Sequence, residues 1–228
     1  AGSDWLDVNA GTHPEREPDD LIWLIESIQP VVDIPLCLDS ANPEALKIAI
    51  QAVQKTPMIN SISGEPERLE KILPLAATHG CDVIALAMDA TKIPETYEKR
   101  LEVIETVLEA TRASGIPDER VYLDPLAMTI ATSNQSAVIA CETIRAMHGK
   151  YPQVHFTIGL SNISFGLPAR AHINRTFLAL AMQAGLDSAI LDPLDRELQA
   201  MILTTELLLG KDHYCLNFVR ASRKGIFG

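Results

Sequence analysis

The sequence of 228 residues predicts an α/β fold, a TIM (β/α)8 barrel, and two observations carry this prediction. Short apolar runs alternate with longer segments of helical periodicity, which is the pattern of βαβ units around a parallel sheet. Apolar residues make up 47% of the chain but aromatic residues only 5%, as in the aliphatic interior of a packed barrel. No linker-like or low-complexity stretch divides the chain, so we expect residues 1–228 to form a single domain.

Seven short runs are predicted to be strands, and several are almost continuously apolar, as in strands buried on both faces. They are Asp4–Ala10, Ile34–Ser40, Pro57–Ser63, Val83–Met88, Val121–Leu126, Phe156–Asn162 and Ser188–Pro193. A closed barrel needs eight strands, so we expect the first βα unit to be missing from this sequence. A doubly wound open sheet is the alternative, but no strand is followed by the GxGxxG loop of dinucleotide-binding folds.

The segments between the strands have the spacing of amphipathic helices. Asn42 precedes one of them, and Pro43 stands in its first turn, where a missing N–H is tolerated. Gly80, Gly115 and Gly185 each follow a helical segment at the position that favours a left-handed cap. The other predicted helices are Glu65–Leu75, Tyr97–Ala113, Ser136–His148, Arg175–Ala184 and Asp195–Leu209.

Charge and cysteine usage narrow the class of protein. The net charge of −11 argues against nucleic-acid binding and against an anionic membrane surface. No apolar run reaches the roughly 18 residues of a membrane span. The four cysteines lie far apart without a CxxC pair, so we expect free thiols in a reducing compartment and a cytoplasmic protein.

Most of the predicted strands end in Asp, Asn or Ser. In a barrel, the carboxyl ends of the strands share the face that carries the active site. A single Asp or Asn at a strand end is usually a helix cap or a turn residue, but a ring of them favours a ligand site. The candidate residues are Asp7, Asn9, Asp39, Asn60, Asp89, Asp124, Ser161 and Asn162.

The chemistry of this ring favours a neutral heterocycle. Carboxylates and amides without a cluster of His or Cys argue against a transition-metal site, and we expect no metal. A magnesium site made of the carboxylates is an alternative, but it does not account for the amides. Asp and Asn together accept hydrogen bonds from exocyclic NH2 and ring N–H groups and donate to carbonyl and ring nitrogen atoms. A pterin or a purine presents this set of groups.

Six segments at the strand ends carry a resemblance to a known family. They are Asp7-Val-Asn-Ala-Gly, Leu36-Cys-Leu-Asp39-Ser, Met58-Ile-Asn60-Ser, Tyr122-Leu-Asp124-Pro, Gly159-Leu-Ser-Asn162-Ile-Ser and Ile173-Asn-Arg-Thr-Phe-Leu. In order and spacing they resemble the methyltetrahydrofolate–corrinoid protein methyltransferases, relatives of the folate module of cobalamin-dependent methionine synthase. The resemblance implies a homodimeric pterin-binding barrel. It also implies transfer of the N5-methyl group between methyltetrahydrofolate and the cobalt of a corrinoid (cobalamin) carried by a partner protein.

The resemblance also implies roles for residues that match the family's motifs. Asp39, Asn60 and Asp124 match positions that hydrogen-bond the pyrimidine ring of the pterin, and Asn162 matches the side chain that contacts N5. We take Asn162 and Asp124 as the catalytic candidates. The remaining substrate-binding candidates are Gly159 and Ser161 beside N5, Arg170 in the following loop, and Asp7, Asn9 and Asp89.

Two departures from the family's pattern are visible. The family's first strand, which carries a glutamate in a Gly-Glu-Arg-like motif, is absent from this sequence. Asp89 stands where some relatives carry Asn, which changes the charge of the site.

The bond to be broken sets the mechanism that the resemblance implies. A methyl group on a tertiary amine is a poor electrophile, so a proton or a strong hydrogen bond must develop at N5 in the transition state. Asn162 cannot supply that proton, but its amide can stabilise N5–H as it forms, a contribution of about 2–4 kcal/mol. The attacking nucleophile is the Co(I) corrinoid, and the carboxylates position the pterin.

Two alternatives remain at the level of the sequence. Dihydropteroate synthase is another pterin-binding barrel, with a Ser-Arg-Lys motif on a late strand. Here Ser222-Arg223-Lys224-Gly225 follows the last predicted helix with no strand beyond it, and the phosphate-binding glycines expected after Asp124-Pro are missing. The second alternative is a pterin-binding module without catalysis, as one part of a larger methyltransferase.

Overall fold

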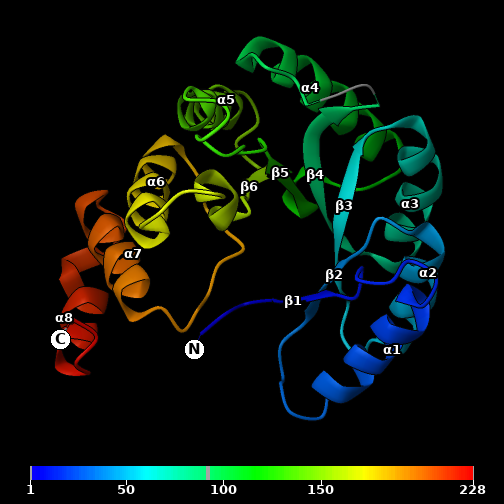
Figure 1. Ribbon diagram of the computed structural model, residues 1–228, viewed down its shortest axis with the longest axis horizontal. Helices are drawn as coiled ribbons and strands as arrows, with labels where there is room; N and C mark the ends of the chain where they lie inside the picture. The colour runs from blue at the N-terminus through cyan, green and yellow to red at the C-terminus, as the bar shows by residue number, and fades with distance from the viewer. Residues whose placement is uncertain (1, 91–92, 228) are drawn as a thin grey trace.

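The computed structural model describes residues 2–90 and 93–227 and shows one sheet of parallel strands that neighbour each other in chain order (Figure 1). The strands are β1 (Leu6–Asn9), β2 (Leu36–Asp39), β3 (Met58–Gly64), β4 (Asp82–Asp89), β5 (Val121–Asp124) and β6 (His155–Phe156). The order of a doubly wound sheet reverses at a switch point, whereas here it never reverses. The strand order is therefore that of a barrel, as the sequence predicts.

Helices cover the outside of the strands, from α1 on one side through α4 and α5 to α6 and α7 on the other (Figure 1). They are α1 (Glu17–Ile28), α2 (Pro43–Ala52), α3 (Pro66–His79), α4 (Tyr97–Ala113), α5 (Ser136–Lys150), α6 (Arg170–Ala184), α7 (Arg196–Leu208) and α8 (Leu216–Arg223). Short 3-10 turns occur at η1 (Asp118–Arg120), η2 (Leu160–Ser164) and η3 (His213–Cys215). No helix in residues 2–90 and 93–227 is both long enough and apolar enough to cross a membrane.

The helix signals in the sequence are confirmed at most ends. The Asn42 side chain caps α2 by accepting from the N–H groups of Glu44 and Ala45. Gly80, Gly115 and Gly185 all adopt positive φ, at 63°, 81° and 122°. Helix α4 has the predicted bounds, while α6 begins at Arg170 rather than at Arg175. Helix α1 lies where no helical range is predicted.

Two predicted strands are shorter than expected. The run Phe156–Asn162 is wrong as a strand, because β6 ends at Phe156 and the chain turns into η2. The run Ser188–Pro193 forms only an isolated parallel bridge between Ile190 and Gly159. The N–H of Ser188 nevertheless donates to the Phe156 carbonyl and that of Ile190 to the Ile158 carbonyl, at 3.0 and 2.8 Å. The seventh segment therefore runs beside β6, and in the described part of the chain β1 pairs only with β2.

Alternation along the strands separates two environments. One set of side chains joins the large aliphatic core between the sheet and the helices. The opposite face contributes a small separate cluster of Cys37, Met58 and Ile84. Because side chains alternate along a strand, Asp39 and Asn60 lie on the same face as Cys37 and Met58, two residues closer to the carboxyl ends. Inside the barrel, the apolar Cys37 and Met58 therefore lie nearer the amino ends of the strands than the polar layer of Asp39 and Asn60.

Candidate functional site

Three polar residues form a row across the first three strands. The sheet register pairs Asn9 with Asp39 and Asp39 with Asn60, so the three lie side by side. Nδ2 of Asn9 donates to Oδ2 of Asp39 at 2.9 Å, and Oδ1 of Asn9 accepts from the N–H of Gly11 at 2.9 Å. The Asn9 amide is thus held at both ends and fixes the orientation of the Asp39 carboxylate.

The carboxyl groups of this row are only partly solvated. Burial raises the pKa of Asp39, the hydrogen bond from Asn9 lowers it, the charge of Glu17 raises it and that of Arg68 lowers it. Asp7 lies two residues before Asn9 on β1. Its pKa is raised, mainly by burial and also by the charge of Asp39. Oδ1 of Asp7 is buried and has no hydrogen-bond partner among the described side chains and backbone. Both carboxyl groups therefore bring acceptors into the interior, and one oxygen of Asp7 is left unused.

Asp124 stands at the end of β5 in the most buried part of the site. Burial raises the pKa of its carboxyl group to about 6, although hydrogen bonds from the N–H groups of Leu126 and Gly159 and the charge of Arg100 oppose the rise. The N–H of Leu126 lies 2.7 Å from Oδ1 of Asp124. Asp124 therefore changes charge near pH 6, unlike an ordinary aspartate.

The turn η2 places Asn162 beside the end of β6. The N–H of Asn162 donates to the carbonyl of Gly159 at 3.1 Å, and its side chain folds back over that residue. A Cβ atom at Gly159 would lie only 2.9 Å from Nδ2 of Asn162. Arg170 holds the turn from the other side: its Nη2 donates to the Ser161 carbonyl at 2.7 Å and its Nε to Oγ of Ser164 at 3.0 Å. Arg170 and Ser161 therefore meet each other, and Arg170 acts on the shape of the turn.

Asp89 lies farther toward the carboxyl end of the sheet than the other candidate residues. The register pairs Leu86 of β4 with Asp124 and Asp89 with Gly64, so Asp89 stands farther along β4, beyond the level of Asp124. The structure thus brings Asp7, Asn9, Asp39 and Asn60 into one group. It places Asp124 and the Gly159–Asn162 turn beside each other and Asp89 at the outer rim.

Buried and half-buried residues that the sequence analysis missed support these groups. Arg100 of α4 is buried at 3% exposure beneath the loops that follow β4 and β5. Arg68 of α3 donates from Nη1 to the Ser61 carbonyl at 3.2 Å, and the Ser40 hydroxyl donates to the buried Glu17 carboxylate. Arg100 had a signal in the sequence, because it shares a helix face with Ile104, an arginine within an apolar stripe.

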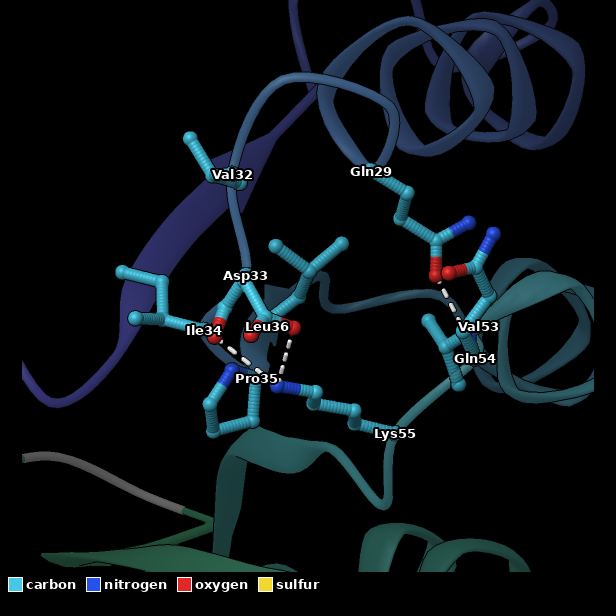
Figure 2. A pocket seen from close by; sticks show the side chains of 9 residues that line it. All are labelled: Gln29, Val32, Asp33, Ile34, Pro35, Leu36, Val53, Gln54 and Lys55. Atoms are coloured by element: carbon cyan, nitrogen blue, oxygen red, sulfur yellow. Dashed lines mark hydrogen bonds and ion pairs between the residues drawn. The ribbon is translucent and has the colours of Figure 1, made fainter.

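Figure 2 shows a small hollow at the opposite, amino-terminal end of the strands. Lys55 crosses it, with Nζ 2.6 Å from Oδ1 of Asp33 and 2.8 Å from the Asp33 carbonyl. Gln29 joins the end of α1 to the end of α2, because its Nε2 donates to the Ala52 carbonyl at 3.1 Å. These contacts tie two loops together on the face of a barrel that serves stability, so we assign the hollow no part in ligand binding.

No group of three or more His, Cys, Asp or Glu side chains is arranged to hold a metal ion within residues 2–90 and 93–227. The polar groups at the carboxyl ends are carboxylates, which accept hydrogen bonds, amides, which both donate and accept, and backbone N–H groups, which donate. This set complements the ring edge of a heterocycle with several N–H and carbonyl groups.

Comparison with known families agrees with this chemistry. The family model described as "Pterin binding enzyme" matches residues 1–192. The chain belongs to the pterin-binding enzyme family. The matched range contains all the candidate site residues and ends before α7.

Two relatives place the chain within this family. It is 38% identical over 230 aligned residues to the methylcorrinoid:tetrahydrofolate methyltransferase of Eubacterium limosum, an alignment that covers 100% of this chain and 85% of that protein. It is 35% identical over 169 residues to the methionine synthase of Mycobacterium tuberculosis, covering 69% of this chain and 14% of that much longer protein.

Solved structures of the family share the fold. A dihydropteroate synthase from Xanthomonas albilineans in complex with 7,8-dihydropteroate aligns with a TM-score of 0.67 over 91% of this chain and 80% of its own, at 20% identity. One from Stenotrophomonas maltophilia aligns with a TM-score of 0.68 over 93% and 83%, at 18% identity. At this identity the likeness shows the TIM-barrel fold of these pterin-binding enzymes and nothing about the reaction.

Proposed function

We propose that this chain is a methyltransferase that moves the N5-methyl group between methyltetrahydrofolate and the cobalt of a corrinoid protein. The observation that carries the proposal is the 38% identity over the whole chain to a methylcorrinoid:tetrahydrofolate methyltransferase. The carboxylate and amide groups at the carboxyl ends of the strands support it, because they complement a pterin. We further propose that residues 1–228 act as one pterin-binding domain.

The pyrimidine edge of the pterin is assigned to Asp39, Asn60 and Asp124. An ionised carboxylate accepts hydrogen bonds from the exocyclic NH2 and the ring N–H, and the Asn60 amide both donates and accepts. Asp7 and Asn9 support this group, since Asn9 orients Asp39 and Asp7 lies beside Asn60. Asp89 is assigned to the rim of the site, where it faces the outer part of the folate.

N5 of the folate is assigned to the turn that carries Gly159, Ser161 and Asn162. The Asn162 amide is not an acid, so it acts by aiming its dipole at the N5–H that develops as the methyl–nitrogen bond breaks. Gly159 keeps the space that the Asn162 side chain occupies, and Arg170 fixes the turn through Ser161. The chain supplies no nucleophile in this scheme, because the methyl acceptor or donor is the corrinoid cobalt of the partner.

Two alternatives make different predictions. The first, dihydropteroate synthase, is disfavoured because its structural likeness is only 20% identical or less among the proteins described above. In addition, Ser222 and Arg223 lie in α8, on the outside of the barrel, and not on a strand. The second alternative is a pterin-binding module without catalysis. It draws on the similarity to methionine synthase, in which the aligned segment makes up only 14% of a much longer protein. It would bind the folate but transfer no methyl group.

The remaining partners follow from charge and exposure. We propose a homodimer that uses the apolar side chains exposed on and around α7 and α8: Leu194, Leu208, Tyr214, Leu216 and Val219. The net charge of −11 supports an absence of nucleic-acid and membrane partners, and the four free thiols support a cytoplasmic location.

One experiment tests the proposed function. The protein is titrated with methyltetrahydrofolate by calorimetry, then mixed with reduced Co(I) cobalamin while the absorbance of methyl-cobalt is followed. Binding followed by methyl-cobalt growth supports the transferase. Binding without transfer, also with the chain's own corrinoid partner, favours the non-catalytic module, and the absence of binding overturns the pterin site.

A further inference from the structure

We propose that Arg100 is a positioning residue: it holds the Pro125–Leu126 turn in a left-handed conformation that aims the Leu126 N–H at the Asp124 carboxylate. This inference rests on the proposed function, in which Asp124 binds the pterin. Arg100 itself is assigned no contact with the substrate, since it is buried on α4 and its hydrogen bonds go to backbone carbonyls.

The hydrogen bonds of Arg100 show what it holds. Its Nε donates to the Pro94 carbonyl at 3.0 Å, and its Nη1 donates to the carbonyls of Pro125 and of Leu126, the latter at 2.9 Å. The first carbonyl lies between β4 and α4, and the other two directly follow β5. One planar guanidinium thus joins two loops at the carboxyl-end face through backbone atoms alone, a task that the single ammonium of a lysine cannot perform in the same geometry.

The turn that Arg100 holds is strained. Leu126 has a φ of 61°, in the left-handed region that a side chain with a Cβ adopts at a cost. In this conformation its N–H lies 2.7 Å from Oδ1 of Asp124 while its carbonyl faces Arg100. A strained residue persists when its surroundings fix it from both sides, and here those surroundings are Asp124 and Arg100.

The same arrangement acts on the charge of Asp124. The groups that favour the ionised carboxylate against burial are the N–H of Leu126, the N–H of Gly159 and the positive charge of Arg100. Burial in turn lowers the pKa of Arg100, and the charge of Asp124 raises it. Arg100 therefore contributes twice, once through the turn and once through its charge, to keeping Asp124 a hydrogen-bond acceptor.

The test separates these two contributions. The protonation midpoint of Asp124 is followed by carbon-13 NMR of the aspartate carboxyl groups in the ligand-free protein, with Asp124→Asn for assignment. Arg100→Met is expected to raise this midpoint by about one pH unit or more. Arg112→Met removes the same charge from the opposite end of α4, where Arg112 pairs with Asp118, and should leave the midpoint unchanged. Arg100→Lys keeps the positive charge but loses the planar guanidinium that bonds both loops. It is the second variant to measure if Arg100→Met does not fold.

The second arm measures methyltetrahydrofolate affinity at a pH of about 8, where Asp124 is ionised in the parent protein. Arg100→Met should weaken binding about tenfold. Adding Leu126→Gly should recover part of the lost affinity, because glycine adopts positive φ without strain. It should lower the NMR midpoint only part of the way back, because the charge of Arg100 is still missing. An unchanged midpoint in folded Arg100→Met, or no recovery by Leu126→Gly, overturns the proposal. If the parent protein binds no folate, the proposed function fails, whereas the ligand-free NMR arm still decides the role of Arg100.

Discussion

Asn162 is the side chain on which the chemistry depends most directly. If its amide stabilises N5–H only as the bond to the methyl group breaks, then Asn162→Ala removes transition-state stabilisation and leaves ground-state binding almost intact. We expect the methyl-transfer rate to fall about 100- to 1000-fold, with a change of about threefold or less in the Kd of methyltetrahydrofolate. Stopped-flow absorbance and calorimetry measure the two quantities. Equal losses in both would count against a role specific to the transition state.

The Asp124 carboxyl group predicts a pH dependence of folate binding. Its pKa is raised to about 6, and the ionised form is the one that accepts from the pterin. Affinity should therefore fall as the pH drops through about 6, and Asp124→Asn should bind weakly at every pH without that inflection. Calorimetric titrations across this range give the midpoint. A midpoint near pH 4 would show that Asp124 has an ordinary, solvated carboxyl group in the ligand-free protein.

The same carboxyl group predicts a pH dependence of stability with the opposite sense. A folded-state pKa raised from 3.8 to about 6 means that the folded protein binds this proton more tightly than the unfolded chain. Its stabilising contribution is complete below about pH 4 and is lost as the pH rises through about 6, a change of about 3 kcal/mol. We expect Asp124→Asn to be more stable than the parent at pH 7.5 and similar at pH 4, as measured by urea unfolding. A lower stability at pH 7.5 would contradict the raised pKa.

Sequence and structure differ in how well they reveal individual residues. Asp39, Asn60 and Asp124 are predictable, because a polar residue that ends an apolar run must lie at the carboxyl end of a buried strand. The raised pKa of Asp124 is not predictable, since it depends first on how deeply the folded chain buries the carboxyl group and then on opposing groups that include the charge of Arg100 in α4. An arginine in an apolar helix stripe is visible in the sequence, but its partners are set only by the tertiary fold.

At the scale of elements, the turn after β6 is the part of the site most sensitive to a small change. Gly159 has a φ of −76°, which any residue adopts, so Gly159→Ala introduces no backbone strain. Its new Cβ would lie 2.9 Å from Nδ2 of Asn162 and must displace that side chain. We expect a loss of methyl transfer close to that of Asn162→Ala, with stability changed by less than about 1 kcal/mol. A fully active Gly159→Ala enzyme would mean that Asn162 acts from another rotamer.

Helix α2 supplies the matched control for such measurements. Asn42 caps it through two backbone N–H groups at the carboxyl-end face, next to the loop that follows Asp39. Asn42→Ala should lower the free energy of unfolding by about 1 kcal/mol and leave methyl transfer unchanged. The cap and Pro43 are readable from the sequence because they are local signals. The turn η2 is not, since the apolar run Phe156–Asn162 satisfies the strand pattern although the chain turns after β6.

At the scale of the whole molecule, the order of the strands could be predicted from the sequence, but the exposed apolar surface could not. Alternating strands and helices allow few arrangements, and the parallel order without reversal follows from short right-handed connections. The distribution of exposed apolar side chains depends on how α7 and α8 pack, which no local pattern states. Leu208 at the end of α7 is 80% exposed, and Tyr214 in η3, between α7 and α8, is 93% exposed, far above what a core residue shows.

That surface predicts the state of association. Exposed apolar side chains in one region favour contact with another protein surface, and a second copy of the same chain satisfies this need with twofold symmetry. We expect a dimer by size-exclusion chromatography with light scattering. The double substitution Leu208→Glu and Leu216→Glu should convert it to a monomer, because each subunit would bring the new charges to the same interface.

Val31→Glu is the control, since Val31 is just as exposed at 78% but lies between α1 and β2, away from α7 and α8. A dimer that survives the double substitution but not Val31→Glu would move the interface to the other side of the barrel.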